Sequence, residues 1–191
     1  MIDSKTLERA IEFASKAHKG QTRKGDGRPY IMHPLSVMGR LGAIKKSTNA
    51  YLLAAAAVLH DTVEDCGVEL DEIAKLFGYY VAGLVEELTL DKSKYDTIGK
   101  TKYLQQEMCK MSSYALCIKL CDRLDNVEDM QSMDATFRRR YTQETIDILT
   151  YLEANRVKIT NTHKKLIVQI LTTLENVEEL SRQGLPQAEE S

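Results

Sequence analysis

The chain has 191 residues and a mass of 21.6 kDa, which suits one domain of ordinary size. Its 43% of apolar and 28% of charged residues fit a soluble globular protein and exclude a disordered chain. Lys and Arg number 26 against 28 Asp and Glu, so the net charge of −2 and the pI of about 6.1 argue against a general nucleic-acid binder.

No apolar run reaches the ~18–20 residues that a membrane-spanning helix needs. The longest, Tyr51–Leu59, is about half that length and ends in His60 and Asp61. The N-terminus carries no apolar signal-peptide core. The four cysteines form no C-x-x-C pair and are too few for a disulfide scaffold. We therefore expect a cytoplasmic protein with reduced cysteines and no membrane partner.

Helical periodicity runs through the chain from its N-terminus. A first helix over about 4–18 precedes a Gly-rich basic loop at 20–29, and a second helix begins at His33 and Pro34. A third, over 50–65, is apolar nearly all round and therefore predicted to be buried, with Cys66 and Gly67 at its end. The remaining helices are predicted at 71–77, 79–90, 102–111, 113–126, 134–154 and 162–181, with a polar connector at 92–101.

The sequence shows no useful strand pattern, internal repeat or linker. It predicts an all-α fold, a single bundle of about eight to ten helices over residues 1–183. Residues 184–191 are expected to be a flexible C-terminal tail. The last helix carries an apolar stripe that should face the core, made of Leu166, Ile167, Ile170, Leu171, Leu174 and Val177.

The strongest chemical signal begins at His60, directly after the five apolar residues Ala55–Leu59. An imidazole beside a carboxylate is costly to bury unless a third group compensates them. A metal ion does so, because neutral His and ionised Asp are both good ligands. Helical spacing places His60 and Glu64 in one column. It places Asp61 and Asp65 in the next column. The alternative is an ordinary acidic helix end in solvent.

Two further signals are His33 and Asp122. His33 follows an apolar pair at a loop-to-helix junction, and Asp122 lies late in an apolar helix. Alone, the histidine would be a capping or core residue, and the aspartate an ion-pair partner. With His60 and Asp61 they offer two imidazoles and two carboxylates from three separate segments. This set suits Mn²⁺, Fe²⁺ or Zn²⁺, and its carboxylates favour Mn²⁺.

A divalent ion at such a site would polarise a phosphoryl oxygen and lower the pKa of bound water. Glu64 and Asp65 follow the proposed ligands closely in sequence. They are therefore placed for general base or acid work on that water.

The arrangement of these residues in an all-α chain resembles the HD metal-dependent phosphohydrolase superfamily. Flanking segments narrow the resemblance to the hydrolase domain of RelA/SpoT-type alarmone enzymes. The segments that carry it are Ala17–Lys24, Pro29–Pro34, His60–Asp65 and Ile118–Asn126. The match covers roughly residues 5–150. Because the chain is too short for the synthetase and regulatory domains, we expect a stand-alone small alarmone hydrolase, similar to the metazoan SpoT homologue.

The resemblance implies an HD-domain bundle that uses Mn²⁺ to remove pyrophosphate from the ribose 3′ position of (p)ppGpp, giving GDP or GTP. It also implies roles by matched position. The metal would be held by His33, His60, Asp61 and Asp122, water activated by Glu64 and Asp65, and the nucleotide bound by Arg23, Lys24, Tyr30 and Asn126. The local chemistry agrees, because an anionic substrate needs cations. Gly25 and Gly27 would let the basic loop approach the ligand closely.

The sequence departs from the family pattern at two places. The loop Gly25–Pro29 looks one residue longer than usual. In the last motif, Cys121 replaces an alanine, Asp125 replaces a histidine, and Val127–Asp129 replaces a Met-Arg-Thr run. These changes add negative charge and remove positive charge near the expected nucleotide pocket, which should disfavour extra phosphates. The base and the phosphate number therefore stay open.

Two other readings of the substrate site stay open. The same metal chemistry could act on (p)ppApp or on the 2′-phosphate of NADPH, or the domain could be a non-catalytic nucleotide sensor.

Arg140 and Tyr141 lie where the family often places a substrate-gating segment, so they are candidates for phosphate contact, with a solvated helix face as the alternative.

Three other sets of residues are assigned structural roles. Cys117 and Cys121 are expected to pack in the core, because they lie one turn apart on an apolar helix. His18 is expected to be a structural residue of the first helix, and His163 is expected to lie at the surface. Oligomeric state stays open.

Overall fold

The computed structural model describes residues 4–183, with side chains up to Leu180, and the tail expected at 184–191 lies outside the described residues. The described part is all-helical, which confirms the predicted fold class. Its only β feature is an isolated bridge between Thr22 and Pro29. The helices are α1 (Ser4–Ala17), α2 (Met32–Ile44), α3 (Ala50–Leu59), α4 (Thr62–Cys66), α5 (Leu70–Phe77), α6 (Tyr79–Leu88), α7 (Lys92–Ile98), α8 (Lys100–Lys110), α9 (Ser113–Asp129), α10 (Ala135–Asn155) and α11 (Asn161–Gln183), with the 3₁₀ turn η1 (Met130–Ser132) after α9.

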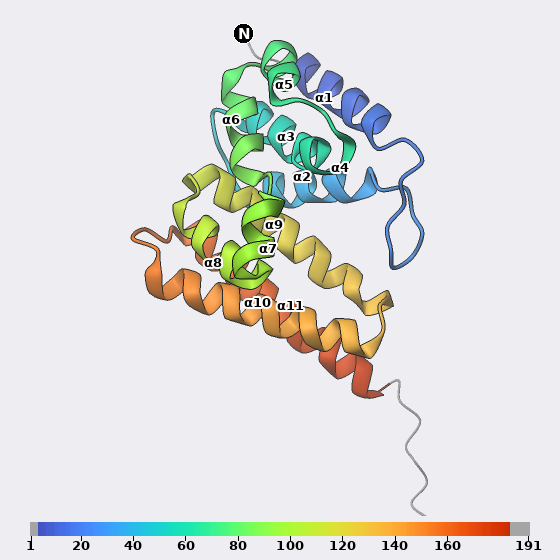
Figure 1. Cartoon of the computed structure of the whole chain (residues 1–191), viewed down its shortest axis with the longest axis vertical. Helices are drawn as coiled ribbons and strands as arrows, with labels where there is room; N and C mark the ends of the chain where they lie inside the picture. Colours follow the sequence, from blue (N-terminus) through green and yellow to red (C-terminus); the bar gives the residue numbers. More distant parts are fainter. Residues whose placement is uncertain (1–3, 184–191) are drawn as a thin grey trace, which may run out of the picture.

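Helix α9 lies at the centre of the molecule. The N-terminal helices α1 to α6 gather at one end in Figure 1, and α8, α10 and α11 gather at the other. Helix α9 contacts α2 and α6 on one side and α11 on the other. Twelve of its seventeen residues are buried, including the polar residues Lys119, Asp122, Arg123 and Asp125. Buried charges need partners, so these four residues mark α9 as the helix that carries a polar site into the core.

Helix α3 is the second buried element, as its apolar sequence predicts. Six of its ten residues are buried, and it packs against α1, α2 and α6. Ala10 and Ala14 of α1 are fully buried, because small side chains let helices approach closely. The predicted stripe of α11 also faces the core: Leu166, Ile167, Ile170, Leu174 and Val177 are at most 3% exposed, and Leu171 is partly buried against the core.

The helix predicted at 50–65 is interrupted at its polar end, so the prediction of one continuous helix was wrong. Helix α3 ends at Leu59, α4 begins at Thr62, and Gly67 with φ +68° ends α4 as predicted. The hydroxyl of Thr62 donates to the carbonyl oxygen of Leu59 at 2.7 Å, which satisfies a helix-end acceptor. His60 and Asp61 therefore stand at a corner between two helices, facing the interior from a turn.

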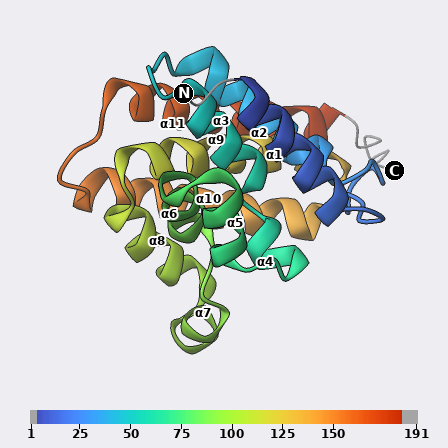
Figure 2. The same ribbon diagram turned by 90° about the horizontal axis from the view of Figure 1, so that it is seen from above.

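The prediction of a polar connector at 92–101 is also wrong, because residues 92–98 form the short helix α7. Asp91 caps it by accepting a hydrogen bond from the backbone N–H of Lys94, and Gly99 follows its end with φ +86°. None of its residues is buried, and Figure 2 shows it projecting from the body of the molecule. A helix without apolar periodicity is recognisable only from its caps.

His163 is fully buried, so the expectation that it lies at the surface was wrong. Its Nε2 donates to the carbonyl oxygen of Ser113 at 3.0 Å, and its Nδ1 accepts from the backbone N–H of Thr160 at 3.2 Å. Burial lowers the pKa of His163, which favours the neutral ring that these two partners need. The predicted core positions of Cys117 and Cys121 are confirmed.

His18 follows the end of α1 and is buried, and it contacts Gln21 and the thiol of Cys66. These contacts agree with the structural role expected for it. No helix among the described residues combines the length and apolar character needed to cross a bilayer.

Candidate metal centre and substrate pocket

Four side chains predicted as metal ligands come together between α2, the corner at 60–61 and α9. One donor atom each from His33, His60 and Asp122 lies within 4.8 Å of the others. Asp61 stands beside this trio, with Oδ1 at 3.1 Å from His60 Nε2 and Oδ2 at 3.6 Å from His33 Nε2. The sequence order separates these residues by up to 89 positions, and the packing of α2 and α3 against α9 joins them.

The histidine His60 shows that the centre fits a cation. Its Nδ1 donates to the carbonyl oxygen of Ala57 at 2.8 Å, which leaves a lone pair on Nε2. That Nε2 is the one buried side-chain nitrogen or oxygen of the described residues without a hydrogen-bond partner. A buried polar atom without a partner is costly, whereas a metal ion would satisfy it. The donor set therefore forms a candidate metal site.

The charges around the centre support the same conclusion. Burial opposes ionisation of Asp122, but Lys119, whose Nζ lies at 2.9 Å, and the two histidines hold its pKa well below the usual value. Asp61 is likewise ionised, because His60 and His33 outweigh its burial and lower its pKa. Two buried carboxylates with adjacent imidazoles attract positive charge.

The carboxylates around the centre also change the pKa of His33. Burial disfavours its charged form, yet hydrogen bonds to Asp122 and Asp125 raise the pKa of His33 to about 9. The neighbouring carboxylates therefore stabilise a positive charge at the ring. A divalent ion bound at Nε2 supplies that charge in place of a proton.

Tyr30 links the candidate metal centre to the surface. Its hydroxyl donates to Asp61 Oδ2 at 2.7 Å and lies 3.4 Å from Asp65 Oδ2. Burial and the neighbouring carboxylates raise the pKa of Tyr30, so the phenol keeps its proton and stays a donor. Tyr30 therefore orients Asp61 while its ring faces a pocket.

The two residues predicted to activate water lie on α4 and point to different places. Glu64 Oε2 accepts a hydrogen bond from the backbone N–H of Leu90 at 3.1 Å, and burial raises the pKa of Glu64. Asp65 is exposed and lines the pocket beside Tyr30. The break after Leu59 means that the predicted helical columns do not continue from His60 to Glu64.

A pocket of about 720 Å³ opens beside the candidate metal centre. It lies between the basic loop, the C-terminal end of α9 and the first turns of α10. Its walls contain every predicted substrate residue, namely Arg23, Lys24, Tyr30, Asn126 and Tyr141. They also contain Arg140, a weaker candidate in the sequence, and Glu144, which lies one helical turn after it. Lys100 and Phe137 line the pocket too, and the sequence did not single them out. Lys100 begins α8 in the segment predicted to be a polar connector, so no motif marked it as a pocket residue.

Arg23 fastens the basic loop to α9. Its Nε donates to Asp129 at 2.6 Å and its Nη2 donates to Asn126 Oδ1 at 3.0 Å. Asn126 in turn donates to Asp122 Oδ1 at 2.6 Å. Gly25 packs against Ser132 so closely that a Cβ there would lie 2.0 Å from the Ser132 hydroxyl oxygen. The close approach expected of Gly25 is therefore to the chain itself.

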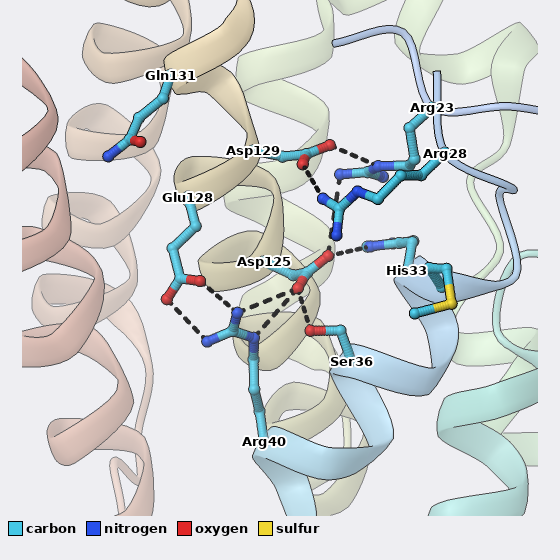
Figure 3. Close-up of a pocket in the computed structure, with 10 residues that line it drawn as sticks. Arg23, Arg28, His33, Ser36, Arg40, Asp125, Glu128, Asp129 and Gln131 are labelled. Atoms are coloured by element: carbon cyan, nitrogen blue, oxygen red, sulfur yellow. Dashed lines mark hydrogen bonds and ion pairs between the residues drawn. The ribbon is translucent and has the colours of Figure 1, made fainter. Parts of the chain in front are cut away.

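The acidic residues that depart from the family pattern are paired with arginines. Figure 3 shows them around a second cavity of about 430 Å³. Arg40 contacts Glu128 at 2.5 and 2.8 Å, and Arg28 contacts Asp129 at 3.1 Å. Three acidic residues line this second cavity, namely Asp125, Glu128 and Asp129, and of these only Asp129 also lines the larger pocket. The added negative charge is thus paired with arginines, and Asp125 and Glu128 lie outside the lining of the nucleotide pocket expected from the sequence.

The fold and the site have counterparts among known proteins. The HD domain family matches residues 10–160. The human guanosine-3′,5′-bis(diphosphate) 3′-pyrophosphohydrolase MESH1 is 41% identical over 128 residues, which cover 65% of this chain and 69% of the human protein. A solved structure of a metazoan ortholog of SpoT, described as hydrolysing ppGpp, covers 95% of this chain and 97% of its own, with a TM-score of 0.71 and 27% identity.

Bacterial relatives are longer. The bifunctional (p)ppGpp synthase/hydrolase SpoT of Escherichia coli is 37% identical over 163 residues, which cover 81% of this chain and 22% of that protein. The chain thus spans about a fifth of the length of the bacterial relatives it matches. The chain belongs to the HD domain family, in the group that contains the SpoT and RelA proteins.

Proposed function

We propose that this protein is a metal-dependent hydrolase that removes the 3′-pyrophosphate of ppGpp or pppGpp, leaving GDP or GTP. One observation carries the proposal. The buried His33, His60 and Asp122 cluster, with the unpartnered Nε2 of His60, adjoins a pocket rich in cationic and aromatic side chains. The similarity to MESH1 and SpoT, which are named as hydrolases of guanosine-3′,5′-bis(diphosphate) and (p)ppGpp, supports the substrate class. We also propose that residues 1–183 form one hydrolase domain.

The ion would be held by His33, His60, Asp61 and Asp122. We propose Mn²⁺, because two carboxylates beside two imidazoles suit it, and Fe²⁺ or Zn²⁺ are the alternatives. When bound, such an ion supplies a Lewis acid that polarises a phosphoryl oxygen and acidifies water. Tyr30 holds Asp61, and Lys119 and Asn126 hold the two oxygens of Asp122, so the protein fixes both carboxylates in advance.

The protein's own groups complete the reaction. Glu64 takes the proton of the attacking water, because its half-buried carboxylate has a raised pKa and lies on the turn that follows Asp61. Asp65, exposed at the pocket wall, is the second candidate for this proton transfer. The raised pKa of Glu64 gives the hydrolase a base that titrates closer to neutral pH than an exposed glutamate.

The pocket offers separate contacts for the base and the phosphates of a nucleotide. Phe137 and Tyr141 stack on each other, with ring centroids 5.7 Å apart and planes within 10°. Arg123 backs the Tyr141 ring at 4.8 Å, which fixes this aromatic face. We propose that the face stacks on the purine. Lys24 and Lys100 make no ion pair with any described residue and line the same pocket, so they are available to phosphates.

Replacing Lys100 by alanine should raise KM for ppGpp about 10-fold or more and change kcat little. A hydrogen bond to a charged group contributes about 1.5–3 kcal/mol, and the metal centre and Glu64 would be untouched. Steady-state kinetics check this, with Lys102→Ala as the matched control. Lys102 lies on the same helix and is exposed, but it does not line the pocket. An equal KM change in both variants would contradict the assignment of Lys100.

A product assay tests the function. The purified protein is given Mn²⁺ and, in parallel, ppGpp, ppApp and NADPH, and the products are separated by anion exchange, with a chelated control. We expect GDP and pyrophosphate from ppGpp and no product after chelation. Consumption of ppApp or NADPH alone would keep the metal site and reassign the substrate. Binding without turnover of any of them would make the domain a nucleotide sensor and overturn the proposal.

A further inference from the structure

The two ring nitrogens of His33 face two different carboxylates. Its Nε2 lies 3.2 Å from Asp122 Oδ1, toward the candidate metal centre. Its Nδ1 lies 2.7 Å from Asp125 Oδ2, on the opposite side of the ring. The side chain of His33 is 1% exposed, so these two carboxylates are the nearest partners of its ring nitrogens. A carboxylate can only accept, so Nδ1 donates its N–H to Asp125. When an ion is bound at Nε2, the ring keeps one proton, and that proton lies on Nδ1.

Asp125 is itself held in place by α2. Its Oδ1 accepts hydrogen bonds from the hydroxyl of Ser36 and from Nε and Nη2 of Arg40, the latter two at 3.2 Å. Ser36 and Arg40 lie one and two turns after His33 on the same helix. Figure 3 shows the three side chains of α2 converging on the single carboxylate of α9. The carboxylate is therefore fixed on both oxygens and has little freedom to turn away from the imidazole.

We propose that Asp125 is a positioning residue that sets the tautomer and orientation of His33 for metal binding. The inference rests on the metal centre of the proposed function and adds a residue that does not touch the ion. A carboxylate behind a ligating imidazole raises its basicity and fixes its direction, and loss of such a partner typically lowers metal affinity 10–100-fold.

The other histidine of the centre, His60, has a different hydrogen-bond acceptor at its Nδ1. His60 donates through Nδ1 to the backbone carbonyl of Ala57, which carries no full charge. Asp125 therefore gives Nδ1 of His33 an anionic acceptor that Nδ1 of His60 lacks. The two histidines of the centre would thus be unequal ligands.

The test compares metal affinities of three variants. Mn²⁺ binding is measured by calorimetric titration for the wild type, Asp125→Ala, Asp125→Asn and Glu128→Gln. Glu128 is the matched control, because it shares Arg40 with Asp125 and does not contact His33. We expect Asp125→Ala to lose 10–100-fold in affinity and Asp125→Asn, which keeps an acceptor but no charge, to fall between it and the wild type. Glu128→Gln should bind as the wild type does.

A second measurement reads the ring directly. In the Zn²⁺-loaded wild type, ¹⁵N spectra should show Nδ1 of His33 protonated, with slow exchange of that proton. In Asp125→Ala the exchange should become fast, and circular dichroism checks that the variant is folded. Unchanged affinity in Asp125→Ala, or an equal loss in Glu128→Gln, would overturn the positioning role while leaving the metal centre in place. A wild type that binds no divalent ion would overturn the metal centre and, with it, this inference.

Discussion

Replacing Asp61 by alanine should abolish metal binding and turnover together and leave the fold intact. The carboxylate lies within 3.6 Å of the Nε2 atoms of both His60 and His33, so its loss removes a quarter of the proposed donor set. The fold should persist because Asp61 is a corner residue whose side chain does not cap α4. Its removal also relieves repulsion with Asp122, which opposes ionisation of Asp61. Activity should fall to that of the chelated wild type.

The measurement pairs bound Mn²⁺ with pyrophosphate release, and circular dichroism reports the fold. Asp96→Ala is the matched control, since Asp96 is an exposed aspartate of α7 that lies outside the pocket. The control should keep full metal content and full turnover. A metal-replete and active Asp61→Ala protein would refute the assignment of Asp61 as a ligand.

The candidate site was more accessible to sequence reasoning than the details of the fold. His33, His60 and Asp122 were predicted to meet because each polar residue interrupts or follows an apolar stretch, where an unpaired charge is costly. The corner after Leu59 was missed, because the apolar periodicity runs up to it without a glycine or proline. Two non-covalent contacts, Thr62 to Leu59 and His60 to Ala57, bend the chain there instead.

Asp125 illustrates why a residue's neighbours cannot be read from its sequence motif. It lies three positions after Asp122 on α9, and its place in the motif suggested that it lies near the nucleotide. The structure instead places Asp125 behind His33, because the face of α9 that carries both residues packs on α2. Spacing along a helix defines the face on which a residue lies, but tertiary packing decides what covers that face. Lys100 was missed for the same reason, since only the fold brings α8 to the pocket.

Replacing Glu64 by glutamine should lower kcat by ~10²-fold or more and leave KM and metal content nearly unchanged, the usual scale for loss of a general base. The glutamine oxygen can still accept the hydrogen bond from the N–H of Leu90, so α4 and its contact should be preserved. Asp65→Asn is measured in parallel, because Asp65 is the neighbouring carboxylate and lines the pocket. If Glu64→Gln turns over normally and Asp65→Asn does not, the base is Asp65.

The pH profile separates the two carboxylates further. Burial raises the pKa of Glu64, and a general base works only when ionised, so kcat/KM should fall as the pH falls through that raised value. The fall should begin at a higher pH than an exposed glutamate, with a pKa of about 4.3, would give. The small activity left in Glu64→Gln should lack this acid limb. An unchanged limb in that variant would show that another group titrates, because a glutamine cannot be protonated in this range.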